Sequence, residues 1–246
     1  MTRRYGWRGY LRDRRDDKFK MASPSISSLP EEWDLFPNCS RIEDQGITSS
    51  CVGHGGQYVM EARDQRIGQE FVELSPYFAY YVARHESGFE DADGGAYVRD
   101  LLGGLKKYGI CQLGYMPSDP EKINEPPSEA ATADAATRKI TSYHRCDSVA
   151  AILGAITMNL PIVYGFACYE SYESLEVSET GLIPFPNGWE KMRGGHCVAG
   201  YAFNRREQWI SGPNSYGYDW GDRGRYKIPF RYFEEELANE VFAVVT

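Results

Sequence analysis

The stretch Asp44-Gln45-Gly46-Ile47-Thr48-Ser49-Ser50-Cys51-Val52-Gly53 is the centre from which the fold of this chain is predicted. Ser49 and Ser50 are good amino-terminal caps, so a helix is expected to begin near Cys51. A thiol there feels the positive end of the helix dipole, which favours the thiolate. Gln45 lies six residues upstream and can direct an amide N–H to the same point. A thiolate beside an oxyanion donor is the start of an acyl-transfer site, whereas a buried cysteine that only fills space explains this stretch equally well.

The bulk composition limits the classes of protein that fit. The 246 residues suffice for one large domain or two lobes, each with a core. The net charge of −8 argues against a nucleic-acid-binding surface over the body of the protein. Residues 1–20 carry eight Arg or Lys and three Asp, which leaves +5 on this segment and −13 on the rest. We therefore expect the basic arm to dock on the acidic body, rather than on nucleic acid or a membrane.

Targeting signals and metal motifs are missing from the sequence. No stretch is apolar for long enough to span a bilayer, and the amino terminus lacks the apolar core of a secretory signal. The six cysteines are widely spaced and include no CxxC pair (Cys39, Cys51, Cys111, Cys146, Cys168, Cys197). This spacing is typical neither of a dense disulfide framework nor of a zinc site. We predict a cytoplasmic protein with no metal and no cofactor; the sequence does not indicate its oligomeric state.

Helices are predicted early in the chain and strands late. Besides the helix at Cys51, which Gly68 can end, Ser75 and Pro76 mark a second helix start. The expected helices and strands then follow in this order: helices 96–108, 130–140 and 149–158; strands 140–146, 161–167, 196–203, 207–212, 224–228 and 241–245. This order predicts an α+β protein with an arm over 1–30, a mainly helical lobe over 31–127 and a β-rich lobe over 128–246.

His196 is the histidine best placed to serve Cys51 as a base. It follows Gly194-Gly195 and opens an apolar strand, so it can reach into a cleft. Asn214 lies downstream and can accept a hydrogen bond from the imidazole, which fixes its tautomer. The other three histidines are expected to be structural (His54, His85, His144).

These residues resemble the papain-like cysteine peptidases. The resemblance rests on Gln-(five residues)-Cys, then Gly-Gly-His, then Asn-Ser-aromatic-Gly with Trp-Gly-x-x-Gly, and it runs from about Trp33 to the end. His196 and Asn214 follow Cys51 by 145 and 163 residues. About 130–150 is typical of the family, so the second spacing is slightly long, as an insertion in the β-rich lobe would make it.

The resemblance implies a two-lobe fold in which a helical lobe packs against a β-barrel-like lobe, with the active-site cleft between them. It implies that Cys51 is the nucleophile, His196 the base, Asn214 its orienting partner and Gln45 the oxyanion-hole side chain. It also implies two further groups: substrate contacts at Gly94, Gly95, Ser50 and Gly195, and an aromatic shield of Tyr216 and Trp220, with Tyr216 where the family usually has tryptophan. Gly195 would offer the substrate pocket no side chain.

The departures from the family pattern point to its bacterial and phage branch. Thr48 stands where secreted members carry a disulfide-forming cysteine, and Ser49 and Val52 replace the common Gly and Trp. The long helical propeptide is missing, and the arm around Tyr5–Leu11 is similar to that branch. A virion component or a protein delivered into a host cell is therefore the alternative to a cytoplasmic one.

The implied activity is a cysteine endopeptidase acting on peptides or proteins through a thiolate–imidazolium pair. The alternatives are a catalytically silent structural or binding component and a cysteine-dependent acyl transferase. For the arm, two positions stay open: across the cleft as a short inhibitory segment, or packed on the back of the β-rich lobe.

Overall fold

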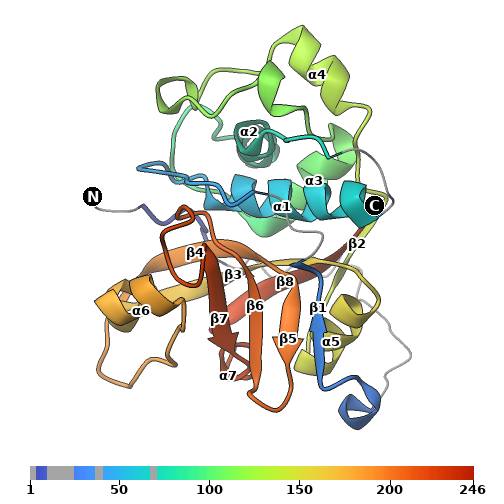
Figure 1. Cartoon of the computed structure of the whole chain (residues 1–246). Helices are drawn as coiled ribbons and strands as arrows, with labels where there is room; N and C mark the ends of the chain where they lie inside the picture. The colour runs from blue at the N-terminus through green and yellow to red at the C-terminus, as the bar shows by residue number, and fades with distance from the viewer. Residues whose placement is uncertain (1–3, 10–24, 37–40, 67–70) are drawn as a thin grey trace.

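The chain folds into a helical half and a strand-rich half that face each other (Figure 1). This computed structural model describes residues 4–9, 25–36, 41–66 and 71–246. Residues 4–9, at the blue end of the chain, lie between the two halves in Figure 1. The predicted α+β class is confirmed.

The helical half is built around α1 (Cys51–Arg66), which packs on α2 (Pro76–Ser87) and α3 (Val98–Lys107). Glycines permit this close approach. A β-carbon on Gly53 would come within 2.2 Å of the Pro76 carbonyl oxygen, and one on Gly56 within 2.7 Å of Leu101. The weak helix formers after Cys51 are therefore offset by packing against neighbouring helices.

The second helix begins as the sequence predicts. Ser75 is the amino-terminal cap, and its hydroxyl accepts a hydrogen bond from the Phe78 N–H at 3.0 Å. The remaining elements of this half are short, namely η3 (Leu113–Tyr115), η4 (Pro120–Lys122) and α4 (Glu129–Ala135). The predicted helix over 130–140 is α4, which ends at Ala135, so the prediction that it runs to Ile140 was wrong. Beyond it, the Arg138 carbonyl accepts a hydrogen bond from the Ile110 N–H and not from a further turn of helix.

Two antiparallel four-stranded sheets form the other half among the described residues. The first has the order β1-β5-β6-β7, with bounds β1 (Glu32–Asp34), β5 (Ala202–Asn204), β6 (Trp209–Pro213) and β7 (Arg225–Pro229). The second has the order β2-β8-β3-β4, with bounds β2 (Ser142–Arg145), β8 (Ala238–Val245), β3 (Ile162–Tyr169) and β4 (Met192–Gly200). Short helices accompany them: η1 (Ile26–Ser28), α5 (Val149–Thr157), η5 (Glu170–Glu173), α6 (Leu175–Thr180) and α7 (Arg231–Glu234).

The sheet with β3 at its centre carries the core and positions the site. Residues Ile162–Cys168 of β3 are all buried, and the register with β4 places Phe166 opposite His196. α1 packs against β4, so the start of α1 and the buried part of β4 meet between the halves.

One strand was not predicted from the sequence, and some residues named in the predictions lie outside the described part of the chain. The sequence did not predict β1; it pairs with β5 and so brings residues 32–34, assigned to the helical lobe, into a sheet. Gly68, Cys39 and the basic residues of 10–24 lie outside the described residues. None of the helices in the described residues has the length and apolar character needed to cross a bilayer.

Candidate active site

Cys51 is the first residue of α1 and is fully buried. Backbone N–H groups of Cys197, Gly6 and Val52 donate toward its Sγ. Cys197 follows His196 directly in β4, so the thiol lies at the junction where the predicted base emerges. Cys51 and the His196 segment, 145 residues apart in the sequence, are therefore brought together.

Burial dominates the electrostatics of this thiol. Desolvation raises the pKa of Cys51 to about 12, although the three backbone N–H groups lower it. This direction is opposite to the one expected from the helix dipole alone. The thiol is therefore protonated at neutral pH while the arm covers it.

His196 and Asn214 form a direct pair. His196 Nε2 lies 2.8 Å from Asn214 Oδ1, and both side chains are buried. The Ser215 N–H donates to the same Oδ1 at 2.8 Å, which fixes the side of the amide that faces the ring. An imidazole held through one nitrogen leaves the other for chemistry.

Aromatic rings surround this pair more completely than the sequence predicts. The Tyr216 ring centroid lies 4.7 Å from that of His196, and Trp220 packs edge-on against Tyr216 at 5.7 Å. Two further rings also face His196: Phe166 at 5.7 Å and Tyr172 at 6.1 Å. The sequence did not predict that either ring contacts His196, because Phe166 looks like any buried residue of a strand and Tyr172 belongs to no motif.

The amide of Gln45, the predicted oxyanion donor, is held by hydrogen bonds at both of its ends. Its Nε2 donates to the Thr48 carbonyl at 2.8 Å and to the Arg4 carbonyl at 3.2 Å. Its Oε1 accepts from the Ser215 hydroxyl at 2.7 Å, so Gln45 is tied to the Asn214 segment of the other half. This bond also fixes which end of the amide carries the donors.

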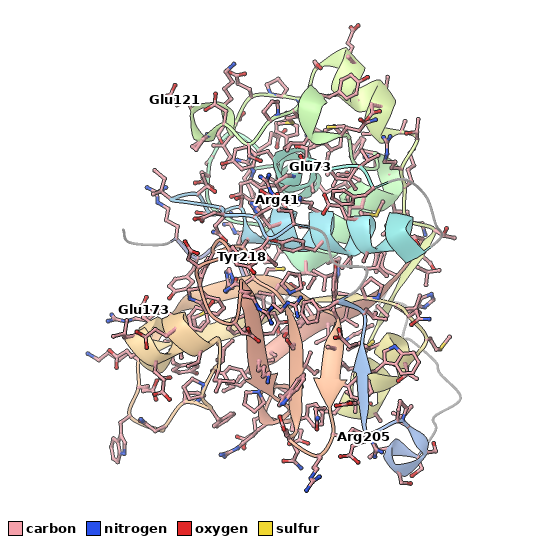
Figure 2. The ribbon with its side chains drawn as sticks, viewed as in Figure 1. Arg41, Glu73, Glu121, Glu173, Arg205 and Tyr218 are labelled. Carbon is pink, nitrogen blue, oxygen red and sulfur yellow. The ribbon has the colours of Figure 1, made fainter. Side chains whose placement is uncertain are left out.

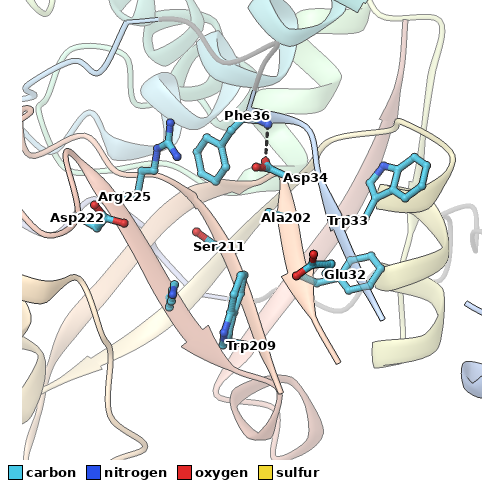
Figure 3. Close-up of a pocket in the computed structure, with 11 residues that line it drawn as sticks. Glu32, Trp33, Asp34, Phe36, Ala202, Trp209, Ser211, Asp222 and Arg225 are labelled. Carbon is cyan, nitrogen blue, oxygen red and sulfur yellow. Dashed lines mark hydrogen bonds between the residues drawn. The ribbon is translucent and has the colours of Figure 1, made fainter. Parts of the chain in front are cut away.

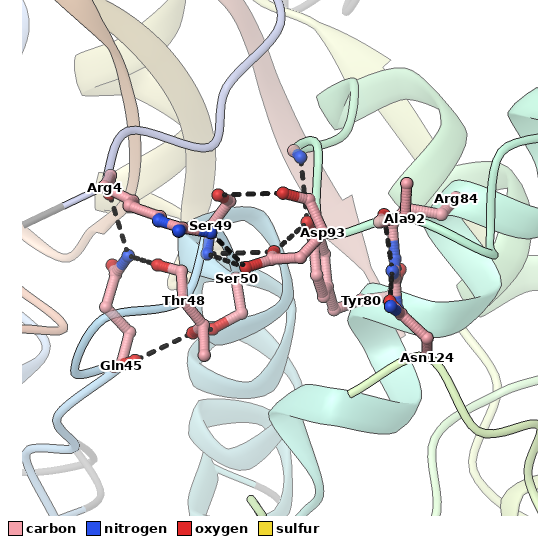
Figure 4. A network of polar contacts seen from close by, with 11 residues as sticks. Arg4, Gln45, Thr48, Ser49, Ser50, Tyr80, Arg84, Ala92, Asp93 and Asn124 are labelled. Carbon is pink, nitrogen blue, oxygen red and sulfur yellow. Dashed lines mark hydrogen bonds and ion pairs between the residues drawn. The ribbon is translucent and has the colours of Figure 1, made fainter. Parts of the chain in front are cut away.

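A polar network holds in place the loop that contains Ala92, Asp93 and Gly95, on the helical side of the molecule (Figure 4). Asp93 Oδ1 accepts from the Ser49 N–H at 3.0 Å and from the Tyr80 hydroxyl at 2.8 Å. The buried guanidinium of Arg84 donates to the Ala92 and Ile123 carbonyls and to Asn124, and lies over the Tyr80 ring. The loop is thus fixed from both sides.

Two predicted substrate contacts are engaged within the protein. The Gly95 N–H donates to the Tyr80 hydroxyl at 2.8 Å, while Gly94 precedes it in the same loop. The Ser50 hydroxyl lies 2.7 Å from that of Thr48 and 3.3 Å from His54 Nδ1, inside the start of α1. Desolvation lowers the pKa of the buried His54 to about 4, so this ring is neutral.

The other two histidines lie away from this constellation. His85 pairs with Glu90 at 2.8 Å near the end of α2, and His144 lies on β2 with its Nε2 3.0 Å from the Ser142 hydroxyl. Within the described residues, no group of three or more His, Cys, Asp or Glu side chains could hold a metal ion. The five described cysteines are free thiols.

Residues 4–9 of the arm lie between the two halves. The Trp7 N–H donates to the Gly195 carbonyl at 2.9 Å, and on the opposite wall the Arg8 N–H donates to the Ala96 carbonyl at 3.1 Å. The Ala96 N–H donates to the Gly6 carbonyl at 2.8 Å. Residues 4–9 therefore bridge both halves with main-chain hydrogen bonds, and of the two positions left open for the arm, this segment takes the one in the cleft.

The side chains of Tyr5 and Arg4 hold the start of this segment in place. The Tyr5 hydroxyl donates to Glu173 at 2.7 Å, and its ring packs on Tyr172 with centroids 6.5 Å apart. Figure 2 shows Glu173 on the strand-rich half. Arg4 lies 3.6 Å from Asp93, an exposed ion pair that contributes little by itself.

A separate cavity of about 490 Å³ opens on the β1-β5-β6-β7 sheet (Figure 3). The Arg225 guanidinium lies 3.9 Å above the Phe36 ring, and the Lys227 ammonium 4.7 Å above the Trp209 ring. Three carboxylates complete the charged lining (Glu32, Asp34, Asp222). The mixed charges favour no single class of ligand, and none of the lining residues belongs to the constellation around Cys51.

The chain is similar in sequence to a peptidase C1-like protein and in fold to solved cysteine proteases. No protein-family model matches the chain. An uncharacterised peptidase C1-like protein of Acanthamoeba polyphaga mimivirus is 30% identical in an alignment of 212 residues that covers 82% of this chain and 68% of that protein. Xylellain, a cysteine protease from Xylella fastidiosa, has a TM-score of 0.88 at 26% identity, over 98% of this chain and 96% of that one. Digestive procathepsin L 3 of Tenebrio molitor shares the fold, with a TM-score of 0.70 at 15% identity over 94% and 75% of the two chains.

Proposed function

The chain belongs to the papain-like cysteine peptidases, and on that premise we propose that it is an endopeptidase that uses Cys51 and His196. The observation that carries this proposal is the peptide already lying in the cleft. The Arg4 carbonyl accepts a hydrogen bond from Gln45, and Gly6 donates its N–H toward Sγ. A site that binds its own main chain in this way can bind that of a substrate.

The proposed mechanism has two steps. The Cys51 thiolate attacks the scissile carbonyl carbon, and the electron pair moves to the oxygen, which Gln45 Nε2 and the Cys51 N–H stabilise. As the C–N bond breaks, the His196 imidazolium gives its proton to the leaving amine. A water molecule then loses a proton to His196 and attacks the acyl carbon, so that the C–S bond breaks and the thiolate returns.

Internal cleavage follows from how the arm crosses the thiol. Arm residues lie on both sides of it, with Tyr5 against Tyr172 and Trp7 against Gly195. A cleft with room for chain on both sides of the nucleophile suits an endopeptidase acting on peptides or proteins.

We further propose that residues 4–9 inhibit the enzyme. They pair with both walls of the cleft and leave the thiol fully buried, so its pKa is raised and the thiolate is scarce. Deletion of residues 1–22 should therefore increase activity, and unchanged activity after the deletion would remove the inhibitory role.

The central experiment compares cleavage of a diverse peptide library by the wild-type chain, by the 1–22 deletion and by Cys51→Ala. We expect the deletion variant to cleave internal bonds and Cys51→Ala to cleave none. A thiol-directed epoxide that fails to label Cys51 in the folded deletion variant would instead support a catalytically silent protein. Amine incorporation that exceeds hydrolysis would support an acyl transferase.

A further inference from the structure

Tyr172 reaches the pair of His196 and Asn214 from a turn that no sequence motif marks. It lies in η5, the short helix that follows β3, and its side chain is buried. Its ring packs on that of His196 with centroids 6.1 Å apart. Its hydroxyl accepts a hydrogen bond from Asn214 Nδ2 at 3.4 Å. One side chain therefore touches both members of the pair.

The hydroxyl holds the end of the Asn214 amide that His196 does not use. Oδ1 lies 2.8 Å from His196 Nε2 and also accepts from the Ser215 N–H. Rotation of the amide by half a turn would aim its N–H groups at the imidazole, where an imidazolium needs an acceptor. In the observed orientation Ser215 satisfies one end of the amide and Tyr172 the other. A buried amide nitrogen that lost this hydroxyl would lose a partner inside the protein, which is costly.

The position of Tyr172 depends on more than the arm. Its ring packs on Phe166 of β3 at 5.5 Å and on Trp220 at 6.2 Å. Tyr5 of the arm is a further neighbour at 6.5 Å. Since the first two contacts belong to the strand-rich half itself, the hydroxyl is expected to keep its place when the arm leaves.

The hydroxyl of Tyr172 stays neutral at the pH of the reaction. Burial raises its pKa well above the ordinary value. Burial also raises the pKa values of its titratable neighbours (Cys168, Tyr5, Tyr216). The charged groups that act on Tyr5 are Glu173 and Arg193, an exposed ion pair at 3.4 Å. A pH profile that changes with this hydroxyl therefore does not report titration of Tyr172 itself.

We propose that Tyr172 is a positioning residue: its hydroxyl orients the Asn214 amide so that Oδ1 meets the imidazolium of His196. This inference rests on the proposed peptidase function, in which His196 carries a proton while Cys51 is a thiolate. An imidazolium whose N–H loses its acceptor gives up its proton more readily. The hydroxyl thus stabilises the thiolate–imidazolium pair through Asn214 and takes no part in proton transfer.

The test compares Tyr172→Phe with its parent, the full chain carrying Gly6→Ala, whose added methyl group overlaps the Ser49 carbonyl and displaces the arm. We expect kcat/KM for a cleaved peptide to fall about five- to tenfold at the pH optimum, the effect of one buried hydrogen bond. The basic limb of the pH profile should also move to lower pH, because the imidazolium loses its proton sooner. A side chain that only fills space would lower the profile without moving this limb.

Tyr232→Phe is the matched control. Tyr232 is also buried, its ring packs on Phe166 at 6.2 Å, and its hydroxyl donates to the Pro184 carbonyl at 3.1 Å. The substitution removes the same atom from a tyrosine that shares the neighbour Phe166 with Tyr172. It should leave the pH profile unchanged, and thermal melts should place the two variants within a few degrees of each other.

A double-mutant cycle with Asn214→Ala separates orientation from packing. If the hydroxyl acts through the amide, Tyr172→Phe should change nothing further once the amide is gone. The rate at which an epoxide probe labels Cys51, followed against pH, gives the same comparison without a peptide substrate. It can therefore be measured even where turnover is slow.

An unmoved basic limb would overturn the inference, and so would an equal fall in rate in the Asn214→Ala background. Either result would mean that Tyr172 only packs, and the peptidase proposal would stand. A melt of Tyr172→Phe far below that of Tyr232→Phe would show that the hydroxyl supports the fold and not the pair. If the parent neither cleaves peptides nor labels at Cys51, the peptidase proposal fails and this inference fails with it.

Discussion

Gly6 of the arm lies directly over Cys51. A β-carbon built on Gly6 would come 3.1 Å from Sγ and 1.8 Å from the Ser49 carbonyl oxygen. Only a residue without a side chain can pass the thiol at this distance. The contact explains how residues 4–9 can bury the Cys51 thiol without any large side chain above it.

Gly6→Ala should therefore open the cleft. The added methyl group overlaps the Ser49 carbonyl, and overpacking of this kind costs about 1–3 kcal/mol, which shifts the arm toward the displaced state. We expect the rate at which an epoxide probe labels Cys51 to rise by about tenfold to a hundredfold.

Gly188→Ala is the matched control, because a β-carbon there meets nothing within 4 Å. Its labelling rate should equal that of the wild type. Equal rates for Gly6→Ala and the wild type would show that the arm does not limit access to the thiol.

Gln45→Ala should lower kcat by about 10²–10³ in the Gly6→Ala background, because one oxyanion donor is lost. Gln45→Glu keeps the shape of the side chain but has no N–H to donate, so its loss should be at least as large. Steady-state kinetics and a thermal melt of each variant check this. A kcat within a few-fold of the parent in both variants would exclude Gln45 from the oxyanion hole.

Arg84→Lys should loosen the loop on the helical wall. An ammonium cannot reach the Ala92 and Ile123 carbonyls and Asn124 together, so buried acceptors lose their partner. We expect a loss of about 2 kcal/mol or more in the free energy of unfolding by urea, together with a higher KM. Arg231→Lys changes an exposed ion pair and is the control; its free energy of unfolding should stay within about 0.5 kcal/mol of the wild type. An equally small change for Arg84→Lys would show that the hydrogen bonds of the Arg84 guanidinium do not stabilise this loop.

Glu240→Gln should stabilise the protein at alkaline pH only. The folded-state pKa of about 7 exceeds the ordinary 4.5, so the folded chain binds more protons between these values and its stability falls as pH rises through them. Above about pH 8 the ionised, buried carboxylate costs on the order of 3 kcal/mol, which glutamine does not incur.

Urea unfolding at several pH values measures this difference, which should shrink toward zero below about pH 4. Glu179→Gln, on the exposed surface of α6, should show no such pH-dependent difference. A constant difference between Glu240→Gln and the wild type at all pH values would mean that Glu240 titrates normally.

Local sequence determined the elements that carry the site. Ser75 before Pro76 fixed the start of α2 by capping, and the buried run after Pro161 defined β3. The cleft between two halves was implied by the resemblance of the Cys51, His196 and Asn214 motifs to a known family. Cys51 begins α1 and Asn214 directly follows β6, whereas His196 lies within β4. Their assigned catalytic roles remain predictions.

Tertiary structure decided what surrounds these residues. Tyr172 and Phe166 reach His196 only through the pairing of β3 with β4, and no sequence pattern marks either ring. The raised pKa of Cys51 likewise depends on burial rather than on its helix position. The bond between Trp7 and Glu240 joins residues 233 positions apart. Sequence alone thus identified the candidate nucleophile and its partners, whereas only the packed chain brought the arm's indole to a buried carboxylate, because long-range contacts follow from sheet register and not from local pattern.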